Sequence, residues 1–229
     1  MVYGGQIGKK FERDGSPRRY PGNTVIADVR PGCGAYQVMQ RLRSMALEAG
    51  FGDSLILLPE DSYHMTVLRG LNDQVRTDDF WPDALSRNAS LSAMDAYVSQ
   101  AVSSVEMPGT IRMRFQGVRV DDEDFRVLLT PADDAQASEL RRFRDAAAAA
   151  IGLFLPGHAD YTYHITLAYT RLVPQGEQAR RLKALTGEME AYLAQQPAFE
   201  TTPPYMAYYE DMLAFLPKRI REPQTQRSW

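Results

Sequence analysis

Apolar residues recur along this chain with two periods, one typical of helices and one typical of strands. Over residues 35–49 they return every three or four positions, which predicts an amphipathic helix that ends at Gly50. The same period predicts three more helices, which begin after Ser90, after Asp133 or Asp134, and over 176–195. We therefore expect four helices.

Short alternating or wholly apolar segments lie between these helices and predict strands. Residues 111–116 and 125–130 flank an acidic turn at 121–124, so together they predict a β-hairpin. The other predicted strands are 23–29, 54–58, 65–68, 163–169 and one or two within 206–215. Hairpins interleaved with helices favour an α+β fold with mostly antiparallel sheets.

Three segments lack a regular period. Residues 1–22 are rich in glycine and basic residues, and we expect them to form an extended N-terminal arm. Residues 71–89 are expected to form a loop, and the polar residues 217–229 a loose C-terminal tail. We expect the whole chain, residues 1–229, to form one domain.

Two of the three histidines occur in the same five-residue pattern. Tyr-His-Met-Thr-Val covers residues 63–67, and Tyr-His-Ile-Thr-Leu covers residues 163–167. Alternate side chains of a strand share a face, so each histidine shares a polar face with the threonine two residues later. The remaining residues of each motif form an apolar face for packing. We expect Leu68 and Ala168 to continue the polar faces as pocket walls.

An imidazole and a hydroxyl on one face suit chemistry at phosphorus. Imidazole gives or takes a proton near neutral pH, and a threonine hydroxyl donates a hydrogen bond to a bound oxygen. If the two polar faces converge, His64 and His164 supply a base for the attacking oxygen and an acid for the leaving oxygen. Thr66 and Thr166 then hold the non-bridging oxygens. This reaction requires no metal ion and no cofactor.

Charge and cysteine content narrow the functional classes. The net charge is −3 and the sequence pI is about 5.7, with no basic block, which favours a small ligand over a long nucleic-acid track. Cys33 is the only cysteine, so one chain forms neither a disulfide nor a thiolate zinc site. With no secretory signal and no apolar run of membrane-spanning length, we expect a cytoplasmic monomer that binds no membrane.

Several residues have both a functional and a structural interpretation. Tyr161 either packs or stacks on a substrate base, and His158, in the loop before the second motif, is a further possible substrate contact. A His/His/carboxylate metal site with Asp61 or Asp160 stays open, although the chain lacks ligand spacing such as His-x-x-x-His. Two histidines buried separately in the core would also explain the motifs.

The paired motifs resemble those of the two-histidine (2H) phosphoesterase superfamily, which includes 2′-5′ RNA ligase-like and cyclic phosphodiesterase-like proteins. The hallmark of that superfamily is two separate His-x-Thr/Ser-x-hydrophobic motifs, matched here by residues 64–67 and 164–167. The resemblance extends from about residue 24 to residue 216. The segments KFERDGSPRRYPGNTVIADV and YYEDMLAFLP are similar to one branch of the superfamily.

The resemblance implies a bilobal α+β fold, with two mostly antiparallel sheets and flanking helices around a central cleft and a pseudo-two-fold axis. It implies metal-independent hydrolysis of a 2′,3′-cyclic phosphate, an ADP-ribose cyclic phosphate or a related RNA-derived phosphodiester. His64 and His164 would be the acid–base pair, and Thr66 and Thr166 would bind the phosphate. The alternative is a nucleotide-binding or RNA-end-binding protein that uses the same residues without turnover.

Overall fold

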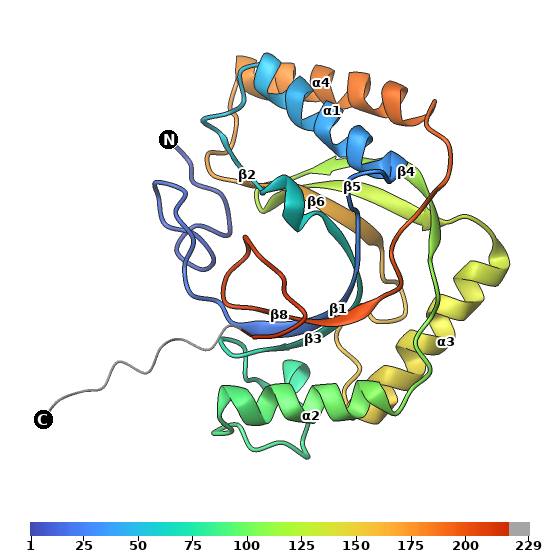
Figure 1. Cartoon of the computed structure of the whole chain (residues 1–229). Coiled ribbons are helices and arrows are strands. Elements are labelled where there is room, and N and C mark those ends of the chain that lie inside the picture. Colours follow the sequence, from blue (N-terminus) through green and yellow to red (C-terminus); the bar gives the residue numbers. More distant parts are fainter. Residues whose placement is uncertain (220–229) are drawn as a thin grey trace, which may run out of the picture.

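The computed structural model describes residues 1–219 (Figure 1). Its four α-helices coincide with the predicted ones: α1 (Gly34–Glu48), α2 (Leu91–Ser103), α3 (Asp134–Ile151) and α4 (Glu177–Leu193). The side chains of Ser90 and Asp133 accept hydrogen bonds from backbone N–H groups in the first turns of α2 and α3. These contacts confirm the expected N-caps.

The strands also form where the apolar pattern predicts them. They are β1 (Gly22–Asp28), β2 (Leu55–Leu57), β3 (His64–Asn72), β4 (Arg112–Val120), β5 (Asp124–Pro131), β6 (Tyr163–Thr170), β7 (Phe199–Glu200) and β8 (Tyr205–Tyr209). β3 extends beyond its predicted end, into the first residues of the expected loop, and the two-residue β7 was not expected. Two short 3-10 turns, η1 (Glu60–Ser62) and η2 (Asp78–Phe80), complete the described elements.

All these strands join one curled antiparallel sheet (Figure 1). The strand order is β7-β4-β5-β6-β3-β1-β8, and β2 pairs with β6 off this path. The expected α+β class with antiparallel pairing is confirmed. The bilobal division into two sheets is not confirmed, because β3 and β6 are themselves joined by the pair Met65–Ile165.

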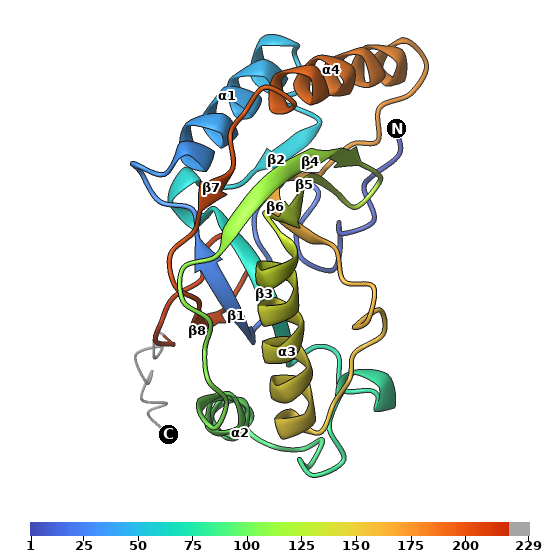
Figure 2. The ribbon, with the colours of Figure 1, turned by 90° about the vertical axis from the view of Figure 1, so that its right-hand side faces the viewer.

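Two pairs of helices pack against one side of the sheet. α1 lies against α4, and α2 lies against α3 (Figure 2). The motif residues Met65, Val67, Ile165 and Leu167 are fully buried, which confirms the predicted apolar face of each motif. The opposite side of β3 and β6, here called the concave face, therefore carries the polar motif residues. The sheet curls around this face (Figure 1).

The N-terminal arm is fixed to the edge of the concave face. The backbone N–H groups of Gly4 and Gly5 donate to the carbonyls of Arg171 and Asp122, which lie beyond β6 and in the β4–β5 turn. Phe11 is fully buried, and its ring lies 4.9 Å from the ring of Tyr169 in β6. The arm is thus a packed part of the domain.

The segment after β8 folds back over the concave face in the same way. Tyr208 and Leu216 exchange backbone hydrogen bonds, and the ring of Phe215 lies 4.9 Å from that of Tyr209. Arg219 forms an ion pair with Asp95 of α2, so the start of the expected loose tail is anchored. The remainder of that predicted tail lies outside the described residues. Within residues 1–219, no helix has the length and apolar character needed to cross a membrane.

Candidate functional site

The two His-x-Thr motifs lie on neighbouring strands. The antiparallel pair Met65–Ile165 sets the register of β3 against β6. His64 therefore lies opposite Thr166, and Thr66 lies opposite His164. All four side chains point to the concave face, where the two histidines are diagonal neighbours, close enough for long side chains on one face to approach each other. One register thus brings together the four residues that the sequence singled out.

A β-bulge follows each motif and reverses the expected direction of the next side chain. The register of β3 against β1 shifts between Thr66 and Leu68, and that of β6 against β5 shifts between Thr166 and Ala168. A bulge places two successive residues on one side of the sheet. Leu68 and Ala168 are buried with the apolar core. The expectation that they line the polar faces is therefore wrong.

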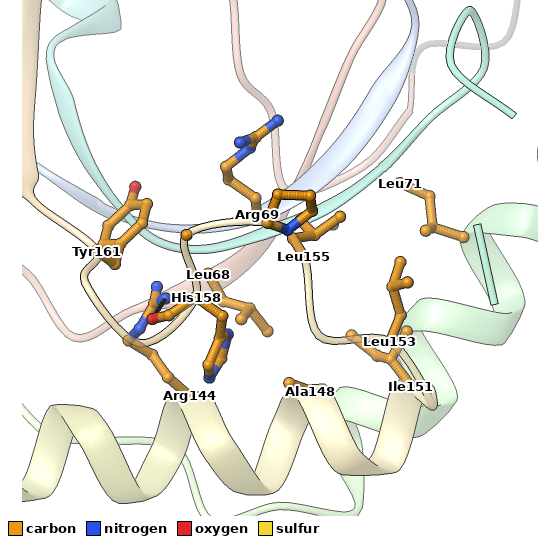
Figure 3. Close-up of a pocket in the computed structure, with 13 residues that line it drawn as sticks. Leu68, Arg69, Leu71, Arg144, Ala148, Ile151, Leu153, Leu155, His158 and Tyr161 are labelled. Carbon is orange, nitrogen blue, oxygen red and sulfur yellow. Dashed lines mark hydrogen bonds between the residues drawn. The ribbon is translucent and has the colours of Figure 1, made fainter. Parts of the chain in front are cut away.

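The bulges return Arg69 and Tyr169 to the concave face. Arg69 is paired with Thr24 of β1, and Tyr169 is paired with Asp124 of β5. Figure 3 shows Leu68 directed toward α3, while the Arg69 side chain extends from the other side of β3. A basic and an aromatic residue thus follow the two motifs at equivalent positions.

Each imidazole is oriented by the backbone two residues before it. Nδ1 of His64 lies 2.7 Å from the carbonyl oxygen of Ser62, and Nδ1 of His164 lies 3.0 Å from that of Thr162. A carbonyl oxygen only accepts hydrogen bonds, so Nδ1 is the donor in both rings. In the neutral form of each ring, Nε2 is therefore unprotonated and able to accept a proton.

His64 lies in an apolar setting with one acidic neighbour. Its ring centroid is 4.2 Å from that of Phe215, and burial is the largest cause that lowers its pKa below 6.5. Asp28, paired with His64 across β1 and β3, opposes this shift by raising the pKa. The Asp28 carboxylate also accepts hydrogen bonds from Arg30 and from the Tyr205 hydroxyl at 3.0 Å.

His164 lies in a basic setting. Burial and, to a smaller extent, the charges of Arg126, Arg69 and Lys10 together lower its pKa to about 4, while the hydrogen bond to the Thr162 carbonyl opposes that shift. Arg126 is paired with Thr166 across β5 and β6, so its side chain shares the concave face. At neutral pH the His164 imidazole is therefore uncharged.

Lys10 reaches the concave face from the N-terminal arm. Its Nζ atom lies 5.0 Å from the ring centroid of Tyr169 and 5.5 Å from that of Tyr20. Burial lowers the pKa of Lys10 to about 8, and the carboxylates of Asp124 and Glu123 oppose that shift. The arm therefore adds a cation to the site.

Sequence reasoning missed five residues around the motifs, namely Lys10, Asp28, Arg69, Arg126 and Phe215. Only Asp28 had a local signal, because it is an acidic residue near the end of an otherwise apolar predicted strand. The others come to the site through bulges, cross-strand register or chain ends that fold back, none of which follows from local periodicity.

Tyr161 and His158 occupy different surroundings. The Tyr161 hydroxyl donates to the carbonyl oxygen of Thr66 at 3.2 Å, and its ring centroid lies 4.0 Å from Cζ of Arg144. Nε2 of His158 lies 2.8 Å from the Asp145 carboxylate of α3. Both border a pocket between β3, α3 and the loop before β6 (Figure 3). A contact of either residue with substrate stays a prediction.

Metal-binding and thiol candidates find no support in the geometry. In the part of the chain that the structure describes, no three His, Cys, Asp or Glu side chains converge as a metal ligand set. This holds for Asp61 and Asp160 as well. Sγ of Cys33 lies 3.1 Å from the carbonyl oxygen of Glu200 in β7. This contact ties the start of α1 to the sheet edge and gives Cys33 a structural role.

Comparison with known proteins supports a phosphodiesterase-like domain. The model of a family labelled 2H-phosphodiest and described as "Domain of unknown function (DUF1868)" matches residues 10–123, which contain the first motif. The fold is similar to the crystal structure of the conserved protein of unknown function ATU0111 from Agrobacterium tumefaciens, with a TM-score of 0.84 and 26% identity over 94% of this chain and 92% of that chain. No curated protein matches the sequence. These comparisons support a two-histidine phosphodiesterase-like domain in this chain.

Proposed function

We propose that this protein is a metal-independent phosphodiesterase that opens a 2′,3′-cyclic phosphate, an ADP-ribose cyclic phosphate or a related RNA-derived phosphodiester. The observation that supports it most is the register of β3 against β6, which sets each histidine opposite the threonine of the other motif. A phosphate between the strands would meet two Nε2 atoms and two hydroxyls. These four side chains supply every group that the proposed chemical step requires.

The surroundings of the two rings suggest different roles. His164 lies among cations that keep its imidazole neutral, so its Nε2 is suited to accept a proton. His64 lies beside Asp28, whose negative charge favours the imidazolium form, so its Nε2 is suited to donate one. We therefore assign His164 as general base and His64 as general acid in hydrolysis.

The proposed reaction is a single in-line displacement. His164 takes a proton from water as the water oxygen bonds to phosphorus. The bond between phosphorus and the 2′ or 3′ oxygen of the ring breaks, and His64 protonates that oxygen as it leaves. The Thr66 and Thr166 hydroxyls donate hydrogen bonds to the non-bridging oxygens, where charge develops. The product is an acyclic phosphate monoester.

A binding protein without turnover is the second candidate. The observation that favours it is the lowered pKa of both histidines, which leaves both rings uncharged at neutral pH before a ligand binds. Catalysis then requires that the bound phosphate raise the pKa of His64. A protein that only binds would not need this shift.

A substrate panel separates the two candidates. Purified protein in EDTA is incubated with 2′,3′-cyclic nucleotides, ADP-ribose cyclic phosphate and 2′-5′ linked dinucleotides, and products are followed by phosphorus NMR. We expect conversion of at least one ester to its monoester. Tight binding of a panel member with no conversion, retained better in His164→Ala than in Thr166→Val, would establish the binding protein instead.

A further inference from the structure

Two cations on the concave face have no acidic partner. Within residues 1–219, neither Lys10 nor Arg69 forms a side-chain hydrogen bond or an ion pair with a carboxylate. Arg126 differs from them, because it forms an ion pair with Asp124. Burial lowers the pKa of Lys10, so its charge is costly there unless an anion compensates it, whereas Arg69 is exposed and its guanidinium is accessible to a ligand. Lys10 and Arg69 therefore have capacity for an anionic ligand.

The placement of Arg69 is built into the strand. The bulge after Thr66 turns Arg69 to the concave face, opposite Thr24. Figure 3 shows its guanidinium on the side of β3 away from α3. Without the bulge, the alternation of β3 would direct this side chain toward the core. The register shift therefore places the Arg69 guanidinium at the site.

The placement of Lys10 is equally fixed. Its neighbour Phe11 is fully buried, and backbone hydrogen bonds from Gly4 and Gly5 hold the arm to the rest of the domain. The Lys10 side chain faces the rings of Tyr20 and Tyr169, the charges of Asp124 and Glu123, and the two arginines Arg69 and Arg126. The charges of Arg69 and Lys10 both act on His164, so the two cations belong to the same part of the face.

The concave face presents more cationic donors than the single negative charge of one phosphodiester requires. A phosphodiester has a single negative charge, and in the proposed reaction the His64 imidazolium already faces it. Lys10 and Arg69 add two cationic donors that no carboxylate binds directly, although the charges of Asp124 and Glu123 act on Lys10. A phosphate monoester carries about −1.5 to −2 at neutral pH and offers three acceptor oxygens. Such a group matches two unpaired cationic donors.

We propose that Lys10 and Arg69 form a second anion subsite, so that the substrate carries another phosphoryl group besides the scissile ester. This inference rests on the proposed function, because it assigns the scissile ester to the His-x-Thr residues. The substrate class is a phosphodiester with a terminal monophosphate or diphosphate on the same molecule. Thr66 and Thr166 hold the reacting phosphate, and the subsite selects the molecule that bears it.

Two substrates that differ only in the second phosphate test the subsite. A nucleoside 2′,3′-cyclic phosphate is compared with its 5′-phosphorylated form, and the ratio of the two kcat/KM values is measured. We expect a ratio of about ten or more in the native protein, because charge-assisted hydrogen bonds to one phosphate are worth at least a tenfold change. Lys10→Met and Arg69→Met should each lower the ratio toward one.

Matched controls are available in the same chain. Lys9→Met removes an exposed neighbouring lysine, and Arg114→Met removes an exposed strand arginine of β4. Both should keep the native ratio. A native ratio near one overturns the subsite. A native ratio retained in both Lys10→Met and Arg69→Met, even with lower rates on both substrates, overturns the assignment to these residues.

Failure of the proposed function gives a different result. If neither these two compounds nor any other ester of the substrate panel is converted, the phosphodiesterase assignment fails. Calorimetry with the same two compounds then tests the subsite alone. Tighter binding of the 5′-phosphorylated compound, lost in Lys10→Met and Arg69→Met, supports the subsite. Equal dissociation constants for the two compounds overturn it.

Discussion

The two His-x-Thr segments have matching local geometry and opposite electrostatic surroundings. Both rings donate from Nδ1 to the carbonyl two residues earlier, and both strands bulge after the threonine. Yet His64 faces Asp28, whereas His164 faces Arg69, Arg126 and Lys10. Local sequence therefore sets how each ring is held, and remote segments set which protonation state each ring favours.

This difference would allow a nearly symmetric pair of histidines to perform the asymmetric reaction proposed above. General acid–base catalysis needs one ring protonated and the other unprotonated at the same pH. Identical motifs in identical surroundings would titrate alike. The carboxylate beside His64 and the cations beside His164 separate the two rings in the direction that the proposed hydrolysis requires.

The largest expected effect is the loss of either motif histidine. His64→Ala and His164→Ala should each lower kcat by about a hundredfold or more, because each removes a proton-transfer group. The comparison variant is His158→Ala, because His158 pairs with Asp145 on the α3 side and takes no part in the proposed proton transfer. Even with the predicted substrate contact, its loss should change kcat by less than about threefold. Steady-state kinetics on the best panel substrate measures this. Equal losses in all three variants would argue against a special role for the motif pair.

The threonines should contribute less. Thr66→Val and Thr166→Val keep the side-chain shape and remove one hydrogen-bond donor each, so each should lower kcat/KM by about tenfold. Thr130→Val, at an exposed position of β5, is the control and should leave kcat/KM unchanged. Native kinetics in both motif variants would show that the hydroxyls do not contact the reacting phosphate.

The pH profile should reveal the assigned roles. Activity is lost as pH falls through the His164 pKa of about 4, because the base becomes protonated. It is also lost as pH rises through the His64 pKa, which lies below 6.5, because the acid loses its proton. The profile of kcat/KM should therefore be bell-shaped, with its maximum on the acidic side of neutrality.

Asp28→Asn sharpens this prediction. Removing the carboxylate charge should lower the His64 pKa further, so the alkaline limb should move to lower pH while the acidic limb stays in place. If the acidic limb moves instead, the roles of His64 and His164 are the reverse of those proposed.

The smallest expected effect is a change in the His64 pKa when the neighbouring aromatic ring of Phe215 is removed. Phe215→Ala removes the ring that lies 4.2 Å from the His64 imidazole, so water should reach the imidazole and raise its pKa toward 6.5. The His164 pKa should not change, because Phe215 does not contact that ring. NMR titration of the imidazole protons measures both values in one experiment. An unchanged His64 pKa would assign its desolvation to other neighbours.

Periodicity predicted the helices, most strands and the shared face of the four motif residues. The helical spacing of apolar residues located α1 to α4, and the two-residue spacing within each motif correctly separated the buried Met65 and Ile165 from the polar pairs. These features depend on local backbone geometry, which a short sequence window contains.

Local periodicity did not predict the strand register or the contacts between segments far apart in the sequence. Alternation predicted that Leu68 and Ala168 would face the site, and bulges reversed them, because an inserted residue shifts a strand without a distinctive sequence. Lys10 and Phe215 reach the concave face only because the N-terminal arm and the segment after β8 fold back over it. The charges that distinguish the two histidines therefore come from segments far away in sequence.

The central claim is that both imidazoles serve one anion. Nitrogen-15 NMR of the imidazoles during a titration with inorganic phosphate tests it most directly. The account predicts that the Nε2 signals of His64 and His164 shift together and fit one dissociation constant. A shift at only one ring, or two distinct dissociation constants, would contradict it.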